Sequence, residues 1–176
     1  MIGKRIAALG QALGMRVLIA SRKTPATPPV DTGLPAPDAS DDRIPFDDVL
    51  RNSTVLVLAL PRTPETLNLI STPELEKMHP YTVIINVARG GIVHEAAVVQ
   101  ALKQRRIAGY ATDVYQVEPL GGPADTPLLE EDVKDLNITL SPHVAWFSTT
   151  SIKNLGEILK ATVEGMVSGN EINAIL

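Results

Sequence analysis

Residues 1–23, MIGKRIAALGQALGMRVLIASRK, place a glycine-led helix directly before a buried strand. The spacing of the apolar residues predicts a helix over residues 4–13, with an apolar face formed by Ile6, Ala7, Leu9, Ala12 and Leu13. After Gly14, the short run at residues 16–20, which is apolar except for Arg16, predicts a strand over residues 15–20. A glycine, a helix and a buried strand in this order are typical of the second half of a βαβ unit of the kind that binds dinucleotides.

The rest of the chain continues this alternation. Apolar runs predict strands over residues 54–60, 81–87, 108–114 and 137–140, and amphipathic or capped segments predict helices over residues 46–52, 72–78, 95–105 and 151–167. Continuous apolar strands are typical of parallel sheets that are covered on both faces. We therefore predict an α/β fold with a doubly wound, Rossmann-like parallel sheet, in which residues 21–44 form a proline-rich surface insertion.

The composition argues against several classes of partner. The 176 residues carry a net charge of −4 with a pI of about 5.4, which argues against nucleic acid or an anionic membrane surface. No apolar run approaches the roughly 20 residues that span a bilayer. The three histidines are scattered and cysteine is absent, so we expect no metal site, no disulfide and a cytoplasmic location.

Arg89, Glu118 and His143 each come shortly after a predicted strand. The carboxyl ends of parallel strands share one edge of the sheet, where ligands of such folds bind. There an arginine can hold a carboxylate with two parallel hydrogen bonds, and a histidine can transfer a proton near neutral pH. A glutamate beside the histidine would fix its tautomer and stabilise its charged form. With a nicotinamide added, these side chains favour hydride transfer to a 2-keto acid.

Four stretches at and after the predicted strand ends carry a family resemblance. They are LPRTPETLNLIS at residues 60–71, INVARGGIV at 85–93, ATDVYQVEPL at 111–120 and SPHVAW at 141–146. In this order they resemble the D-isomer-specific 2-hydroxyacid dehydrogenases, and the resemblance extends from Gly3 to about Gly169. We therefore predict a nucleotide-binding domain over residues 1–169 and a C-terminal tail over residues 170–176. Trp146 and the VEPL loop are most similar to the glycerate dehydrogenase, or hydroxypyruvate reductase, branch.

The resemblance implies an NAD(P)-dependent oxidoreductase that acts on a small D-2-hydroxy acid or 2-keto acid, with hydroxypyruvate or glyoxylate favoured. It implies that Arg89 binds the substrate carboxylate, that His143 donates the proton and that Glu118 supports His143. It also assigns contacts with the nicotinamide or the adenosine to Leu60, Pro61, Thr66, Val87, Ala88, Asp113 and Ala145. For a full-length parent it implies a homodimer.

The glycine fingerprint departs from the family pattern. Gly3 takes the third glycine position of GxGxxG, whereas the first strand, the first two glycines and the family's separate substrate domain are absent from the sequence. We therefore expect a sequence truncated at its N-terminus, lacking the first strand and most of the glycine loop, with a half-built pyrophosphate site. By itself, such a chain is expected to bind cofactor weakly and to turn over little substrate.

A second departure lies at the end of the first predicted strand. Ser21 stands where the family usually has the acid that binds the ribose, and Arg22 and Lys23 follow it. Because a hydroxyl and two cations suit a 2′-phosphate, the sequence favours NADP over NAD. At two helix starts, we expect Thr72 to be the N-cap, and His94 to cap more weakly than the family's usual aspartate.

Other interpretations of these residues stay open. Arg89 could be an ordinary surface arginine, and Arg22 with Lys23 a solvated pair. Glu118 could be a solvated loop acid, and His143 could cap the last helix. The chain could instead be a non-catalytic nucleotide-binding or scaffold module, or an inactive fragment of a longer dehydrogenase. Turnover of a 2-keto acid would distinguish an enzyme from a non-catalytic module and from an inactive fragment.

Overall fold

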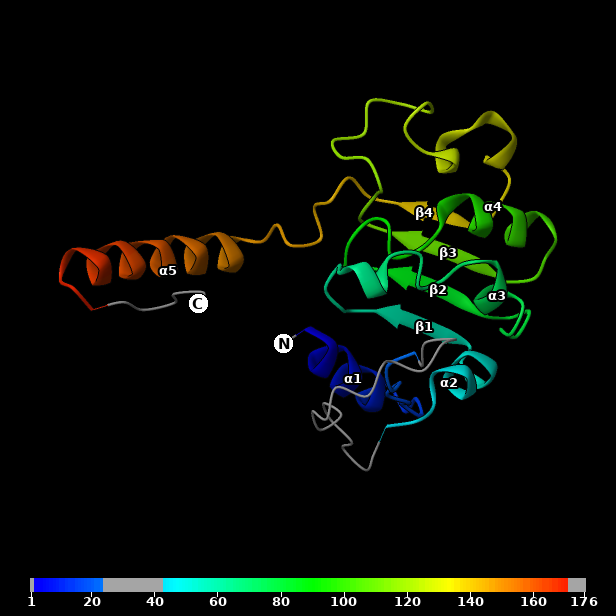
Figure 1. The fold of residues 1–176 in the computed structure, drawn as a ribbon, viewed down its shortest axis with the longest axis horizontal. Coiled ribbons are helices and arrows are strands. Elements are labelled where there is room, and N and C mark those ends of the chain that lie inside the picture. The colour runs from blue at the N-terminus through cyan, green and yellow to red at the C-terminus, as the bar shows by residue number, and fades with distance from the viewer. Residues whose placement is uncertain (1, 24–42, 171–176) are drawn as a thin grey trace. The chain divides into compact units, whose positions relative to one another are not determined.

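The computed structural model describes residues 2–23 and 43–170 (Figure 1). Its helices are α1 (Ile2–Ala12), α2 (Phe46–Asn52), α3 (Thr72–Leu75), α4 (Glu95–Lys103) and α5 (Thr149–Val167), and its strands are β1 (Val55–Leu58), β2 (Val83–Asn86), β3 (Gly109–Thr112) and β4 (Ile138–Leu140). Most of the predicted insertion and of the predicted tail lies outside the described residues. The chain divides into an N-terminal unit, Met1–Pro142, and a C-terminal unit, His143–Leu176.

The N-terminal unit contains a four-stranded sheet in the order β1-β2-β3-β4. Every neighbouring pair is parallel, and the register aligns Leu56 with Ile84 and Ile84 with Tyr110. Figure 1 shows the four arrowheads pointing the same way, toward one edge of the sheet. The predicted Rossmann-like α/β fold is therefore confirmed, although each strand is shorter than predicted because residues at one or both ends of each run do not join the ladder.

One row of side chains on the sheet lies in the hydrophobic core. Along β1 and β2, buried residues such as Leu56, Leu58 and Ile84 alternate with more exposed ones. They belong to one cluster with residues of α2, α3 and α4, among them Val49, Leu50, Leu75, Val98 and Leu102. Removal of this apolar surface from water stabilises the unit.

The segment after Gly14 differs from the prediction. The sequence predicts a strand over residues 15–20, but the structure has a single parallel bridge between Ala20 and Ile44, so this prediction is wrong. A strand needs a neighbouring ladder, and the doubly wound order places another strand between this segment and β1. Among residues 2–23 and 43–170 no strand takes that place, and Met15 and Ile19 stay exposed.

Two helix starts show how side chains satisfy free backbone groups. The N-cap of α3 is Ser71 and not Thr72, so that prediction is wrong. The reason is the spacing of a capping box, because Glu74 Oε2 accepts a hydrogen bond from the Ser71 N–H at 3.0 Å. At α4 the predicted cap is confirmed, since His94 Nδ1 accepts from the Ala97 N–H at 3.1 Å.

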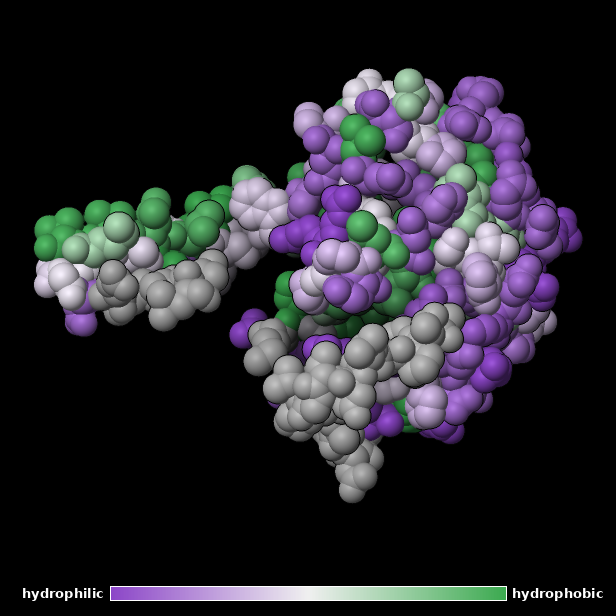
Figure 2. Space-filling model, in the orientation of Figure 1, coloured by the Kyte–Doolittle hydropathy of each residue, from purple (hydrophilic) through white to green (hydrophobic). Residues whose placement is uncertain are grey.

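The C-terminal unit contains α5, which confirms the predicted long amphipathic helix. Ser148 caps it, because its hydroxyl oxygen accepts from the Ser151 N–H at 3.1 Å. Figure 2 shows hydrophobic side chains along one side of this helix, and its exposed apolar residues include Ile152, Leu155, Leu159, Val163 and Met166. None of the helices in the described parts of the chain has both the length and the apolar character needed to cross a bilayer.

Candidate active site

The residues singled out from the sequence follow the carboxyl ends of the strands. Leu60 and Pro61 follow β1, Val87 to Arg89 follow β2, and Asp113 to Glu118 follow β3. Because the strands are parallel, these segments share one edge of the sheet, which is where ligands bind in open α/β folds. The N-terminal unit thus places Arg89, Asp113 and Glu118 on loops at a common edge.

The turn that carries Arg89 is held by hydrogen bonds with the Asn86 side chain. The Asn86 side chain is 1% exposed, accepts from the Ala88 N–H at 3.1 Å and donates to the Arg89 carbonyl at 3.1 Å. The Arg89 guanidinium is exposed and donates one bond to the Ala88 carbonyl at 2.7 Å. The sequence interpretation missed Asn86, although a polar residue closing the apolar run VIIN was a usable signal.

Gly90 allows the Arg89 turn to contact the loop after β3. A Cβ atom at Gly90 would lie 1.6 Å from the carbonyl oxygen of Tyr115, so a larger residue does not fit without movement of the backbone. Gly91 has φ of +77°, a conformation that favours glycine. The two glycines of the ARGG stretch therefore hold the turn in close backbone contact with the segment that leads to Glu118.

Glu118 is held at the surface by the backbone of its own loop. Its Oε1 atom accepts from the Tyr115 N–H at 2.8 Å. The Tyr115 hydroxyl donates to the Ser141 carbonyl at 2.9 Å, which ties the loop to the end of β4. Burial, and then the charges of Asp113, Glu95 and Glu118, raise the pKa of the Tyr115 hydroxyl, so the phenol remains a neutral donor.

Asp113 is a buried acceptor at the same edge. Its carboxylate is 5% exposed and accepts from the Ser141 hydroxyl at 2.6 Å. At the end of β1, the Thr66 hydroxyl donates to the Pro61 carbonyl at 2.9 Å and fixes that loop. α1 begins close to the same strand end, since a Cβ atom at Gly3 would lie 3.6 Å from Ala59 Cβ.

The structure describes His143 and Ala145 in the C-terminal unit. His143 has φ of +55°, and its carbonyl accepts from the Trp146 indole N–H at 2.8 Å. Trp146 is half exposed and stacks edge-on against Phe147. The structure therefore groups Arg89, Asp113 and Glu118 within one unit, whereas the role of His143 stays a prediction.

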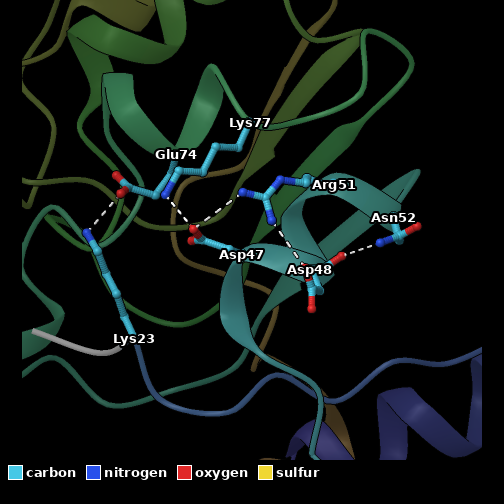
Figure 3. Close-up of polar contacts among 7 residues, drawn as sticks. All are labelled: Lys23, Asp47, Asp48, Arg51, Asn52, Glu74 and Lys77. Atoms are coloured by element: carbon cyan, nitrogen blue, oxygen red, sulfur yellow. Dashed lines mark hydrogen bonds and ion pairs between the residues drawn. The ribbon is translucent and has the colours of Figure 1, made fainter.

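The three residues after the first predicted strand have different surroundings. The Lys23 ammonium lies 2.8 Å from Glu74 Oε1, and the Glu74 side chain is only 3% exposed (Figure 3). Arg22 is exposed. The pKa of Glu65 is lowered first by a hydrogen bond with the Thr63 side chain, and the charge of Arg22 lowers it further. Lys23 is thus engaged within the protein, while Arg22 faces solvent beside the loop after β1.

A second ion-pair group lies next to Glu74. Lys77 of the segment after α3 lies 2.8 Å from Asp47 Oδ2, and Arg51 contacts both Asp47 and Asp48 (Figure 3). Pairs as exposed as these contribute little stability. Among the described residues, no group of three or more His, Asp or Glu side chains could hold a metal ion.

A comparison with known families identifies the chain. The family model described as "D-isomer specific 2-hydroxyacid dehydrogenase, NAD binding domain" matches residues 1–145. The chain belongs to this family. Among curated members of the family, it is 37% identical to the glycerate dehydrogenase of Methylorubrum extorquens over 99% of this chain and 49% of that one. It is 35% identical to the glyoxylate reductase of Aeropyrum pernix over 98% of this chain and 49% of that one.

Solved structures of the family have the same fold. The NAD-complexed D-isomer-specific 2-hydroxyacid dehydrogenase of Lactobacillus delbrueckii ssp. bulgaricus matches with a TM-score of 0.77 and 27% identity, over 99% of this chain and 52% of that one. An NADPH-dependent glyoxylate/hydroxypyruvate reductase of Sinorhizobium meliloti, in complex with NADP and malonate, matches with a TM-score of 0.77 and 27% identity, over 99% and 50%. The chain spans about half the length of these relatives.

The side chains at the sheet edge fit a nicotinamide nucleotide. The buried Asp113 carboxylate suits a carboxamide N–H, and the Ser21 hydroxyl with the exposed Arg22 suits the ribose end of the molecule. The start of α1 beside β1 suits a pyrophosphate, because the first turn of a helix presents free N–H groups. The donor set therefore agrees with the family's NAD-binding domain.

Proposed function

We propose that this chain is the nucleotide-binding part of an oxidoreductase that interconverts a small 2-keto acid and a D-2-hydroxy acid with NAD(P), with hydroxypyruvate or glyoxylate as the substrate. The observation that carries the proposal is the exposed Arg89 guanidinium on a turn fixed by Asn86, at the same sheet edge as Asp113 and Glu118. Relatives named glycerate dehydrogenase, glyoxylate reductase and hydroxypyruvate reductase support this substrate class.

Arg89 would bind the substrate carboxylate. One guanidinium N–H is used on the Ala88 carbonyl, which orients the group and limits its freedom before substrate arrives. The remaining donors of the planar fork can form two parallel hydrogen bonds with a carboxylate. The polarised carbonyl carbon of the bound 2-keto acid would then lie beside the cofactor site.

His143 would donate the proton that the reduced carbonyl oxygen needs, and Glu118 would support the charged form of the imidazole. The bound nicotinamide would supply the hydride to the carbonyl carbon. Hydride and proton together convert the keto acid into the hydroxy acid. Glu118 suits this supporting role because its own loop already holds the carboxylate on the Tyr115 N–H at 2.8 Å.

The cofactor would occupy the strand ends. Its nicotinamide or its adenosine would contact Leu60, Pro61, Thr66, Val87, Ala88, Asp113 and Ala145. Gly3 would approach the pyrophosphate, and Ser21 with Arg22 would meet the ribose. We also propose a homodimer for the full-length protein, on the family resemblance, and a cytoplasmic location, since a cysteine-free chain fits a reducing compartment.

We propose a preference for NADP that depends on Arg22 more than on Lys23. Arg22→Ala is expected to weaken binding of 2′,5′-ADP about tenfold or more, because one charge-assisted hydrogen bond is lost. Binding of 5′-AMP, which lacks the 2′-phosphate, is expected to change little. Lys23→Met is expected to change the 2′,5′-ADP affinity less than about twofold, because its ammonium is engaged by Glu74.

Calorimetric titration of the three proteins with both nucleotides tests this assignment. Lys23→Met is the matched control, as it also removes one cation from the same segment. Equal losses of 2′,5′-ADP affinity in both variants would show that Lys23 leaves Glu74 to bind the phosphate. Tighter binding of 5′-AMP than of 2′,5′-ADP by the unmodified protein would overturn the NADP preference itself.

The enzymatic function is tested by turnover. The purified full-length protein, of which this chain would be the nucleotide-binding part, is incubated with NADPH or NADH and with hydroxypyruvate, glyoxylate or pyruvate, and the loss of reduced cofactor is followed. We expect one equivalent of 2-keto acid to be consumed per equivalent of cofactor oxidised, fastest with hydroxypyruvate or glyoxylate. Nucleotide binding without any turnover would instead support a non-catalytic module.

A further inference from the structure

Glu95 at the start of α4 is a buried carboxylate that accepts two hydrogen bonds from residues outside its own helix. The residue is 6% exposed. Its Oε1 atom accepts from the Gln116 N–H at 2.9 Å, and its Oε2 atom accepts from the Thr126 hydroxyl at 2.6 Å. Both donors belong to the connection between β3 and β4, so one side chain of α4 holds two points of that connection.

The two hydrogen bonds from Gln116 and Thr126 stabilise the Glu95 carboxylate without a cation. A buried charge is costly unless donors satisfy it. Among the described residues Glu95 forms no ion pair, and its position in the first turn of α4 adds the favourable end of the helix dipole. The carboxylate and the two loop donors therefore depend on one another, because displacement of the loop would leave a buried charge unsatisfied.

The segment fixed by Glu95 is the one that carries Glu118. Two consecutive backbone amides of this segment donate to carboxylates, because the Tyr115 N–H donates to Glu118 and the Gln116 N–H donates to Glu95. The same segment contacts the Arg89 turn, where a Cβ atom at Gly90 would lie 1.6 Å from the Tyr115 carbonyl oxygen. Glu95 itself follows that turn closely in the sequence, at the beginning of the next helix.

We propose that Glu95 is a positioning residue that couples the Arg89 turn to the Glu118 loop. By holding the Gln116 amide, it keeps the preceding Tyr115 amide directed at the Glu118 carboxylate and fixes both loops at one edge of the sheet. The inference rests on the proposed role of Glu118 in proton transfer. Glu95 touches neither substrate nor cofactor in this assignment.

Two substitutions separate positioning from a simple effect of charge at the helix start. Glu95→Gln keeps the length of the side chain and an oxygen that can accept from Gln116, but removes the charge. Glu95→Asp keeps the charge beside the helix dipole, but its carboxylate is one methylene shorter. Val98→Ala is the control for general loss of stability, because Val98 is a fully buried residue of the same helix.

The readout is amide hydrogen exchange and the amide proton chemical shift of Tyr115 and Gln116 in isotopically labelled protein. We expect both amides to exchange about tenfold faster or more in Glu95→Asp than in Val98→Ala, with a changed Tyr115 shift, because the loop loses its anchor. Glu95→Gln is expected to restore exchange to within about threefold of the unmodified protein. If Glu95→Asp does not fold, Thr126→Val, which removes the second donor, is expected to raise exchange at Gln116 and Tyr115 together.

The proposal would be overturned if the amides exchanged fast in Glu95→Gln but at the rate of the unmodified protein in Glu95→Asp. That result would mean that Glu95 acts through its charge at the start of α4. Faster exchange at Gln116 with Tyr115 unchanged would also overturn it, because the effect would not reach Glu118. These measurements need no turnover. An unchanged kcat in Glu118→Gln would instead contradict the proposed role of Glu118 in catalysis. The amide exchange result on Glu95 would not be affected.

Discussion

Replacement of Arg89 by methionine in the full-length protein is expected to lower kcat/KM for hydroxypyruvate about a thousandfold, since two charge-assisted hydrogen bonds to the substrate carboxylate are lost. The turn around Arg89 should stay intact, because Asn86 holds it through the Ala88 N–H and the Arg89 carbonyl and not through the guanidinium. The free energy of unfolding should therefore change little, and the loss should be one of substrate binding and orientation.

Two further variants sharpen this test of Arg89. Arg89→Lys keeps the charge but not the planar fork, so its loss should be smaller but still about tenfold or more. Arg51→Met makes the same change at an exposed arginine that pairs with Asp47 and Asp48, and should leave kcat/KM unaltered. Activity of Arg89→Met within about threefold of the unmodified protein would contradict carboxylate binding by this residue.

Gly90→Ala is expected to destabilise the protein by about 3 kcal/mol or more, because the added methyl group collides with backbone and not with a movable side chain. The Cβ position lies 1.6 Å from the Tyr115 carbonyl oxygen and 2.0 Å from its carbon. Relief of this overlap must separate the Arg89 turn from the Glu118 loop. Denaturant unfolding measures the effect, and failure to accumulate as folded protein counts as the same result.

Gly156→Ala is the matched control for this substitution. Gly156 lies within α5, and apart from its own helix no described atom would lie within 4 Å of a Cβ atom there. Alanine is preferred over glycine in a helix by about 0.5–1 kcal/mol, so this variant should be neutral or slightly more stable. A Gly90→Ala protein as stable as Gly156→Ala would show that the two loops are not in tight contact.

The fold was predictable from the sequence because its signals are local. Each buried strand is a continuous apolar run, and the helices between them have a clear apolar side, as in β2 (Val83–Asn86) followed by α4 (Glu95–Lys103). Parallel order follows from that alternation. The position of Arg89 at a sheet edge followed in turn, since a residue directly after a parallel strand must lie there.

The properties that the sequence does not supply depend on distant partners. Residues 15–20 have the apolar pattern of a strand, but pattern does not supply a neighbouring strand to pair with. The role of Lys23 at a phosphate stays a prediction, and its ion pair with Glu74, which is far along the chain, could not be read from the sequence. In the same way, nothing near Glu95 in the sequence points to Gln116 or Thr126.

The capping residues illustrate a narrower limit. Ser71 and Thr72 are adjacent hydroxyl residues, and either could begin α3. The reciprocal contact of Glu74 with the Ser71 N–H decides between them. The capping-box spacing was present in the sequence and would have identified Ser71 if it had been given more weight than the position of Pro73.

The most direct test of hydride transfer follows a label. The full-length protein is incubated with hydroxypyruvate and with NADPH that carries deuterium at C4 of the nicotinamide, prepared as each of the two labelled forms, and the product is analysed by mass spectrometry. Hydride transfer predicts glycerate with deuterium at C2 from one of the two forms, and greatly reduced product with Arg89→Met. Unlabelled glycerate from both forms, or no glycerate from full-length protein that binds 2′,5′-ADP, would contradict the proposed function.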